Sequence, residues 1–313
     1  MANSTQAPLS CLLHGKATKA SLEFYLKFFF AIWFVRYLLD PLQTLGGMPV
    51  EYADPVGPLR WIPDTVRESL FSTTGLSVLR FGLLASCIGV WIKAFRPQAA
   101  LMACLLLTLA AAIPRSFGHI NHAELGPIIV TWVLSLFYVK LSASEETNSD
   151  DENATASAGL ITATTILMFA YAFVGVARLC DGGWQLFVGD TIPNHVSQGS
   201  YSNWVLPFDL APMVLENQFL IGSLKLGTLA VTFLEIAAPF ALISKRVRYT
   251  VLLVMPMFHI GAILMFKVIF AEQVLALILL INISPLLSGK PSSANIDENE
   301  SAHKKSQAAT NLA

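Results

Sequence analysis

Eight apolar runs constrain the fold of this chain more than any other feature. A helix needs about 20 mostly apolar residues to cross a bilayer, and each run comes close to that length. Only 13% of the residues are charged, whereas a soluble domain has about 25%. We therefore predict an all-α fold, a multi-pass transmembrane bundle of about eight helices with no large extramembrane domain. The predicted spans are Leu22–Leu39, Leu76–Trp91, Ala99–Ile113, Leu125–Val139, Leu160–Leu179, Ile221–Ile243, Val251–Phe266 and Ile269–Leu287.

Polar segments flank and interrupt the apolar runs. We predict a cytoplasmic tail over residues 1–20, a transmembrane domain over 21–288 and a flexible cytoplasmic tail over 289–313. The segment Ser142–Ser157 is acidic and rich in Ser, Asn and Ala. Because such a composition buries little apolar surface, we expect this segment to be solvated and flexible as well.

The distribution of Lys and Arg predicts the orientation, because these residues concentrate on the cytoplasmic side of membrane proteins. With the N-terminus inside, they fall mainly in cytoplasmic segments, and the long loop Cys180–Leu220 contains none. The other long outside loop, Asp40–Thr74, is an exception because it holds Arg60 and Arg67. We predict a cell-membrane protein with both termini in the cytoplasm and these two loops outside, where long loops often act as lids or binding loops.

Composition also excludes some partners. The net charge of −1 argues against a nucleic-acid partner, because such proteins usually carry a basic patch. The four cysteines are scattered and form no Cys-x-x-Cys pair, so we predict neither a disulfide framework nor a zinc knuckle. The pair His119-x-x-His122 with nearby Glu124 is too small a set for a metal site, and we predict no metal.

The stretch Gly175–Asp190 gathers charges, glycines and an aromatic residue at one membrane edge. It places Arg178, Asp181 and Trp184 directly after a long apolar run. Arg178 cannot readily act as a base, but it can bind a carboxylate or stabilise developing negative charge. Alternatively, Trp184 is an interfacial anchor, because tryptophan is enriched at membrane–water interfaces. We predict that Arg178 binds anionic groups at the mouth of a pocket.

Two histidines lie in or beside apolar runs, where ionisable residues are costly and mark functional sites. His122, next to Asn121, opens the fourth predicted helix, where unpaired backbone N–H groups could bind an anionic or carbonyl oxygen. Helix capping by Asn121 and His122 is the structural alternative. His259 lies within the seventh predicted helix among apolar neighbours. A buried imidazole at this position requires a hydrogen-bond partner. That partner is either structural or a substrate.

Glu235 lies inside the sixth predicted helix, in the run Phe-Leu-Glu-Ile-Ala-Ala-Pro. A carboxylate among apolar residues in a membrane must be paired or protonated. By residue type, Arg80, Arg178 and Lys225 are possible partners, and the sequence leaves the choice open.

Three segments occur in a suggestive order. They are Asn121-His122-Ala-Glu-Leu125 before an apolar helix, Tyr171-Ala-Phe-Val-Gly-Val-Ala-Arg178 before a Trp, and Phe258-His259 before Met265-Phe266. They resemble the Asn-His-x-x-Leu, Tyr-Phe-x-x-Gly-x-x-Lys…Trp and Phe-His…Met-Phe segments of the HTTM superfamily, which includes vitamin K-dependent gamma-glutamyl carboxylase. Order and approximate spacing agree over most of Leu22–Leu287. The resemblance implies a carboxylase-like membrane fold. Small bacterial relatives include toxin-peptide maturation factors and DoxX-like proteins linked to quinone redox chemistry.

The chain departs from this family where the carboxylase chemistry lies. Arg178 stands at the place of the lysine that acts as the base of the carboxylase, and Gly261 and Ala262 replace the polar residue that follows the later histidine. The resemblance therefore implies the fold but not gamma-glutamyl carboxylation by the known route.

These observations combine into one hypothesis, a polar pocket near the outer leaflet that binds a lipophilic, quinone-like or lipid molecule and modifies it or a peptide. The predicted catalytic residues are His122, His259 and Arg178, and the predicted substrate-binding residues are Glu235, Asn121, Trp184 and Asp181. A quinone is the cofactor that the resemblance suggests, and the bilayer and a secreted peptide are the other expected partners. The alternatives are a non-enzymatic partner in the maturation or export of a secreted peptide, a DoxX-like redox protein and a small-solute carrier.

Overall fold

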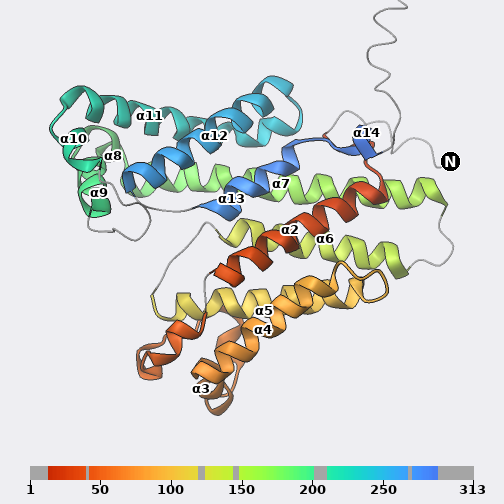
Figure 1. Cartoon of the computed structure of the whole chain (residues 1–313). Coiled ribbons are helices and arrows are strands. Elements are labelled where there is room, and N and C mark those ends of the chain that lie inside the picture. The colour runs from red at the N-terminus through yellow and green to blue at the C-terminus, as the bar shows by residue number, and fades with distance from the viewer. Residues whose placement is uncertain are drawn as a thin grey trace, which may run out of the picture.

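A computed structural model describes residues 13–39, 42–118, 124–143, 148–200, 210–266 and 270–287. All regular secondary structure in these ranges is helical, as Figure 1 shows, which confirms the predicted all-α bundle. The long helices are α2 (Lys19–Leu39), α4 (Thr73–Gly89), α5 (Arg96–Ser116), α6 (Leu125–Ala143), α7 (Ser149–Gly182), α11 (Gln218–Ala237) and α12 (Lys245–Phe266). The short helices are η1 (Leu42–Gly47), η2 (Val50–Tyr52), η3 (Gly57–Trp61), α3 (Asp64–Phe71), α8 (Gln185–Val188), α9 (Thr191–Ser200), α10 (Ala211–Leu215), η5 (Ala238–Leu242), α13 (Ala271–Ala276), η6 (Leu277–Leu280) and α14 (Ser284–Leu287).

Five helices are long and apolar enough to cross a membrane, namely α5, α6, α7, α11 with η5, and α12. α3 and α4 meet the same requirement only together, and the chain bends by 78° between them. α2 has the length but carries Glu23, Lys27 and Arg36. The fold is therefore an all-α bundle with several helices that are long and apolar enough to cross a membrane, and the described residues contain fewer continuous apolar spans than the eight that we predicted.

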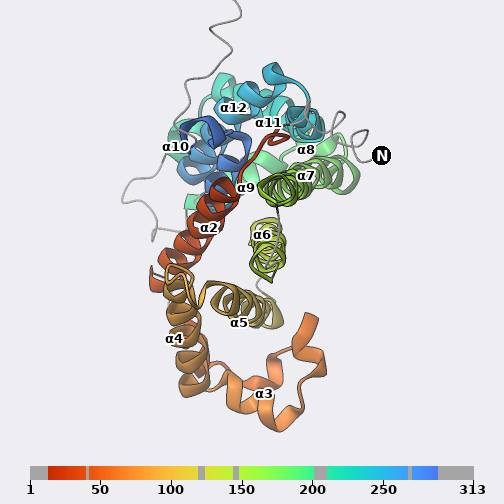
Figure 2. The same ribbon diagram turned by 90° about the vertical axis from the view of Figure 1, so that its right-hand side faces the viewer.

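The bundle is arranged around α2, α6 and α7. Figure 2 shows α3, α4 and α5 on one side of these helices and α11 and α12 on the other. The largest fully buried side chains include Trp33, Tyr25 and Phe29 of α2, and the Trp33 indole donates a hydrogen bond to Thr131 Oγ1 of α6 at 2.8 Å. Bulky aromatic side chains of α2 thus fill the centre of the molecule.

The charges of α2 are paired with charges on its neighbours. Arg96 Nη1 of α5 lies 2.8 Å from Glu23 Oε2, and Arg36 Nε lies 2.8 Å from Glu272 Oε1 of α13. Arg36 Nη2 also lies 3.2 Å from Glu124 Oε1. Charges that are removed from water require such partners, so these pairs explain how a charged helix occupies the middle of the bundle.

The predicted last span, Ile269–Leu287, is wrong as a single helix. α13 has six residues and continues into the 3-10 helix η6, and the backbone is extended at Ile281. A new helix, α14, begins at Ser284, whose N–H donates to Asn282 Oδ1 at 3.1 Å. A side chain that captures a backbone N–H in this way favours a turn over a continuing helix, which explains the break.

The predicted flexibility of Ser142–Ser157 is wrong for most of this segment. α7 already begins at Ser149, and its first turn holds Asp150, Asp151 and Glu152, which are favourable at the positive end of the helix dipole. Ser157 is buried, and its hydroxyl accepts a hydrogen bond from Ala17 N at 3.0 Å. Residues 144–147 lie outside the described residues.

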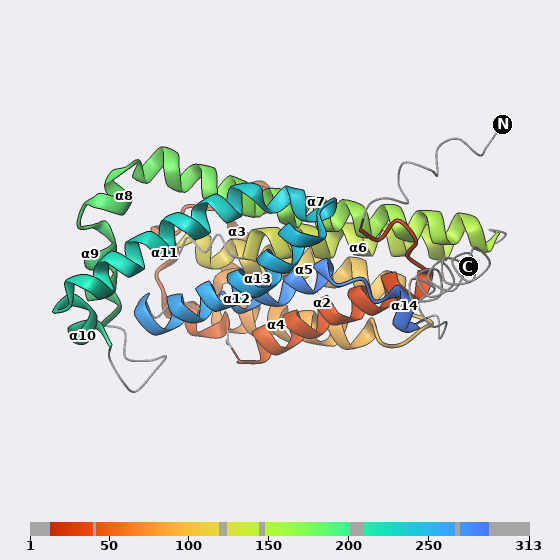
Figure 3. The ribbon, with the colours of Figure 1, turned by 90° about the horizontal axis from the view of Figure 1, so that it is seen from above.

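The segment Cys180–Leu220, which we predicted to be an outside loop, is largely helical in its described residues. α7 continues to Gly182, and Gly183 ends the helix with φ +54°, a conformation that favours glycine. α8, α9 and α10 then gather at one end of the bundle, while α14 and the start of α7 lie at the opposite end (Figure 3). At its 34 residues, α7 is about 51 Å long, and it connects the two ends.

Candidate ligand-binding site

A cavity of about 530 Å³ lies at the end of the bundle that is covered by α8 and α9. Its volume falls within the range of roughly 300–1,000 Å³ that small-molecule sites have. α7, α11 and α12 supply most of its walls, and Phe270 and Gln273 close the side next to α13. The lining residues are Val174, Arg178, Leu186, Ile192, His195, Gln198, Thr228, Glu235, Phe258, His259, Ala262, Phe266, Phe270 and Gln273.

Arg178 and Glu235 form a two-point ion pair in this cavity. Arg178 Nη1 lies 2.5 Å from Glu235 Oε2, and Nη2 lies 3.3 Å from Oε1. Arg178 Nη1 also donates to Thr232 Oγ1 at 3.1 Å. Of the three possible partners of Glu235, Arg80 instead donates to the backbone of Tyr37 and Leu38.

The third possible partner, Lys225, instead donates a hydrogen bond from Nζ to the carbonyl oxygen of Val188 at 3.3 Å. Glu235 therefore occupies N–H groups of Arg178 that we expected to bind an anionic ligand. The pair brings one positive and one negative charge to the cavity wall, so its net charge is zero.

Gly175 makes this pairing possible because it lets α7 and α11 approach closely. A Cβ atom at this position would lie 2.9 Å from the Thr232 carbonyl oxygen and 3.0 Å from Glu235 Cβ. The first distance is shorter than real Cβ contacts and the second is tighter than most of them, so a larger residue would require the two helices to shift apart. The glycine is one turn before Arg178 on α7, which places the guanidinium directly over the carboxylate.

His259 is buried in the wall of the cavity, with 5% of its surface exposed. Neither of its ring nitrogens has a hydrogen-bond partner among the residues that the structure describes. Aromatic rings surround it, with centroid distances of 5.2 Å to Phe270 and 6.5 Å to Tyr171. A buried polar group without a partner costs about 1–3 kcal/mol, so the imidazole is suited to a hydrogen bond with a molecule inside the cavity.

The structure brings together three of the residues that the sequence singled out, namely Arg178, Glu235 and His259. Asp181 is exposed, Trp184 is 64% exposed, and neither lines the cavity. The Trp184 ring lies 5.9 Å from that of Phe187, which fits an interfacial anchor.

His122 and Asn121 lie outside the described residues. Their expected roles in catalysis and substrate binding therefore stay predictions.

Four polar lining residues escaped the sequence analysis, and one of them is Thr228 of α11. His195 and Gln198 are exposed residues of α9 that reach the cavity, and nothing in their local sequence distinguishes them from loop residues. Gln273 follows Glu272 inside an apolar segment. Two polar residues in such a segment were a usable signal, because polar groups at membrane depth are costly.

Ion pairs behind the cavity hold α13 in place. Glu272 is 5% exposed and pairs with Arg36 of α2, which in turn pairs with Glu124. Arg115 of α5 extends the network, with its Nη2 atom 3.8 Å from Glu124 Oε2. Because Gln273 is the next residue after Glu272, this network fixes the position of the amide at the cavity wall.

The described residues contain no group of three or more His, Cys, Asp or Glu side chains that could hold a metal ion. The cavity instead combines aromatic and aliphatic walls with two imidazoles, a paired guanidinium and carboxylate, and two amides. Such a combination can bind a largely apolar molecule and orient its polar group by hydrogen bonds.

Comparison with known proteins found no matching family model, no matching curated protein and no matching solved structure. The resemblance to the HTTM superfamily therefore stays a prediction.

Proposed function

We propose that this chain is an integral membrane protein that binds a lipophilic small molecule in the cavity around His259. The observation that carries the proposal is the buried imidazole, whose two nitrogens have no partner among the described residues and which faces a cavity of about 530 Å³. Buried polar groups in folded proteins are hydrogen-bonded as a rule. A bound molecule supplies the partner that the described residues do not.

The charges of the site support a molecule with an uncharged polar group. Arg178 and Glu235 neutralise each other at 2.5 Å, so neither is available to balance a phosphate or an ammonium group without breaking a buried pair. Neutral imidazole has one N–H donor and one acceptor nitrogen. A carbonyl oxygen on a quinone-like molecule can accept from the N–H group, and a hydroxyl group on a lipid can accept from it or donate to the other nitrogen.

We further propose that His259 transfers the proton if the bound molecule is modified, since an imidazole is the side chain best suited to proton transfer near neutral pH. In this proposal, Arg178 and Glu235 position the molecule as a neutral pair. This role replaces the anion binding that we expected of Arg178 from the sequence.

The experiment that tests the proposal is mass spectrometry of molecules that co-purify with the protein from native membranes in mild detergent. Wild-type protein is expected to carry a lipophilic molecule at close to one copy per chain, and His259→Phe is expected to lose it. Gly222→Ala, a change with open space around it and outside the lining of this cavity, serves as the matched control. The absence of any enriched molecule in the wild-type protein would contradict the proposal.

We also propose that the end of the bundle that holds α14 and the start of α7 faces the cytoplasm. Lys19 of α2 pairs with Glu152 at 2.8 Å, and Ser21 Oγ lies 2.9 Å from Ser284 Oγ, so both described chain ends lie at this end. The Lys and Arg bias of the sequence favours the cytoplasmic side for it. Labelling of single cysteines introduced at Lys16 and Gly183, with a reagent that does not cross membranes, tests the orientation.

A second candidate function is that of a partner for a secreted peptide, which the cover of the cavity favours. α8 and α9 form this cover, and the exposed residues His195 and Gln198 reach from its surface into the cavity. This candidate predicts that a co-purifying peptide is retained in His259→Phe and lost when residues 185–200 are replaced by a Gly/Ser linker.

A further inference from the structure

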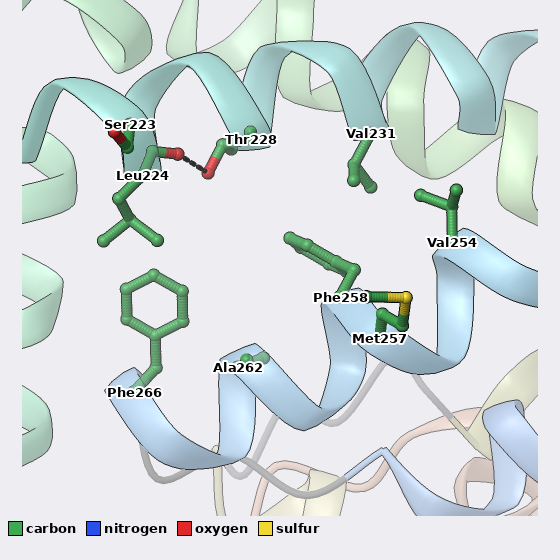
Figure 4. Close-up of a pocket in the computed structure, with 11 residues that line it drawn as sticks. Ser223, Leu224, Thr228, Val231, Val254, Met257, Phe258, Ala262 and Phe266 are labelled. Atoms are coloured by element: carbon green, nitrogen blue, oxygen red, sulfur yellow. Dashed lines mark hydrogen bonds between the residues drawn. The ribbon is translucent and has the colours of Figure 1, made fainter. Parts of the chain in front are cut away.

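A second hollow lies between α11 and α12 and is chemically different from the cavity around His259. It has a volume of about 320 Å³ and is lined almost entirely by apolar atoms. We call this hollow the α11–α12 groove, and its lining residues are Ser223, Leu224, Gly227, Thr228, Val231, Val254, Met257, Phe258, Gly261, Ala262 and Phe266. Figure 4 shows Phe258 and Phe266 extending from α12 toward α11, with Leu224 facing Phe266.

The polar groups inside the groove are already satisfied or lie at its edge. Thr228 Oγ1 donates to the Leu224 carbonyl oxygen at 2.9 Å within its own helix (Figure 4), and Ser223 is exposed. The groove therefore offers an occupant dispersion contacts and burial of apolar surface rather than hydrogen bonds.

The groove shares a wall with the cavity around His259. Thr228, Phe258, Ala262 and Phe266 line both hollows, so only these side chains stand between them. Ala262 has the smallest side chain of the four, so the shared wall contains the least side-chain volume at this position. On its other side, Phe258 lies against the Arg178 guanidinium, with 5.8 Å between its ring centroid and Cζ.

The groove also opens toward the outside of the bundle. Met257 lines it and is 64% exposed. Glycines widen it, since a Cβ atom at Gly227 or Gly261 would meet nothing within 4 Å. The two helices are the least covered of the candidate spans, with 22% of their apolar windows buried compared with 50% for α6. In a bilayer, the open side of the groove faces the lipid chains.

We propose that the α11–α12 groove holds the hydrocarbon chain of a single-chain amphiphile whose uncharged polar head lies in the cavity beside His259, Arg178 and Glu235. The inference rests on the proposed function and adds the class of molecule, a neutral lipid with one narrow chain that enters sideways from the bilayer. We specify one chain because the groove is a single hollow of about 320 Å³ between two helices, and in this proposal the chain enters the cavity beside Ala262, the smallest side chain of the shared wall.

The test compares three probes with the full-length protein in nanodiscs. 4-Dodecylphenol has an uncharged head and one chain, 4-ethylphenol has the same head without the long chain, and dodecylphosphocholine has the same chain with a zwitterionic head. Dissociation constants are measured for wild-type protein and for Gly227→Phe and Gly261→Phe, which fill the groove. Gly222→Phe is the matched control, because Gly222 also has open space around it but does not line the groove.

Both groove variants are expected to weaken 4-dodecylphenol by about tenfold or more, since excluding two methylenes from an apolar site already corresponds to this factor. They should leave 4-ethylphenol within about twofold, and Gly222→Phe should change neither probe. A diazirine at the end of the dodecyl chain should cross-link to α11 and α12.

Three results would overturn the inference. If 4-dodecylphenol binds equally to the groove variants while His259→Phe abolishes its binding, the chain lies elsewhere and only the proposed function stands. If dodecylphosphocholine competes as well as 4-dodecylphenol, the groove holds an ordinary bilayer lipid. If neither phenol binds the wild-type protein, both the groove inference and the proposed function are wrong.

Discussion

The ion pair between Arg178 and Glu235 gives the sharpest test of how this site is built. The Glu235 side chain is 3% exposed and that of Arg178 is 23% exposed, so the two ends of the pair differ in their access to water. Arg178→Met leaves a buried carboxylate without its cation, and removing one partner of a buried pair costs about 3–5 kcal/mol. Glu235→Met leaves a guanidinium that still reaches the cavity and Thr232, so we expect a smaller loss, of about 2–3 kcal/mol.

The double variant Arg178→Met/Glu235→Met should be less destabilised than the sum of the two single variants. Apolar replacement of a whole buried pair is often close to neutral, and residues in contact show coupling of about 0.5–3 kcal/mol. The free energy of unfolding is measured by SDS titration in mixed micelles, followed by circular dichroism. Losses that add within about 0.5 kcal/mol would refute the pairing.

A surface pair provides the control for this cycle. Arg67 Nη2 lies 2.5 Å from Asp64 Oδ1, but the Asp64 side chain is 79% exposed. Exposed pairs contribute about 0–1 kcal/mol, so Arg67→Met should change the free energy of unfolding by less than about 1 kcal/mol. A loss at Arg67 equal to that at Arg178 would show that burial does not determine the result.

Three further predictions follow from single positions. Gly175→Ala should destabilise the protein and weaken ligand binding, because its Cβ would lie 2.9 Å from the Thr232 carbonyl oxygen, whereas Gly222→Ala, with open space around it, should be neutral or stabilising in the same SDS titration. Burial lowers the pKa of His14, which lies before α2, from 6.5 to about 4, so the unfolded state binds a proton first as the pH falls. The free energy of unfolding should therefore drop by about 2 kcal/mol between pH 7 and pH 5 through this group, and His14→Asn should remove that share of the pH dependence. Glu272→Gln should weaken ligand binding through displacement of α13, detected as a higher dissociation constant, and an unchanged constant would contradict the positioning role.

The sequence predicted the helices whose formation depends only on the composition of one segment. Long apolar runs became helices α5, α6, α7, α11 and α12, because a bilayer-length apolar run must satisfy its backbone internally. The last run failed as a single helix. A hydropathy pattern contains no information about the hydrogen bond from Ser284 N–H to Asn282 Oδ1. This local hydrogen bond interrupts the helix after η6.

For the candidate site, the sequence predicted which residues are involved but not how they pair. The sequence marked Arg178, Glu235 and His259 because ionisable groups in apolar runs need a reason to be there. The sequence left Arg80, Arg178 and Lys225 as possible partners of Glu235. The choice depends on which helices pack together and on their relative position along the helix axes. Gly175 decides this relative position through a close approach of α7 and α11, a distance that only the three-dimensional structure reveals.

In the proposed function, a lipophilic molecule occupies the cavity and forms a hydrogen bond with His259. A crystal structure of the protein, grown in a lipidic mesophase from membranes without added ligand, tests this most directly. We predict density for one ordered molecule in the cavity, with a polar atom within about 3.2 Å of a ring nitrogen of His259. A cavity filled by water alone, or an imidazole whose nitrogens are both bonded to protein atoms, would contradict the account.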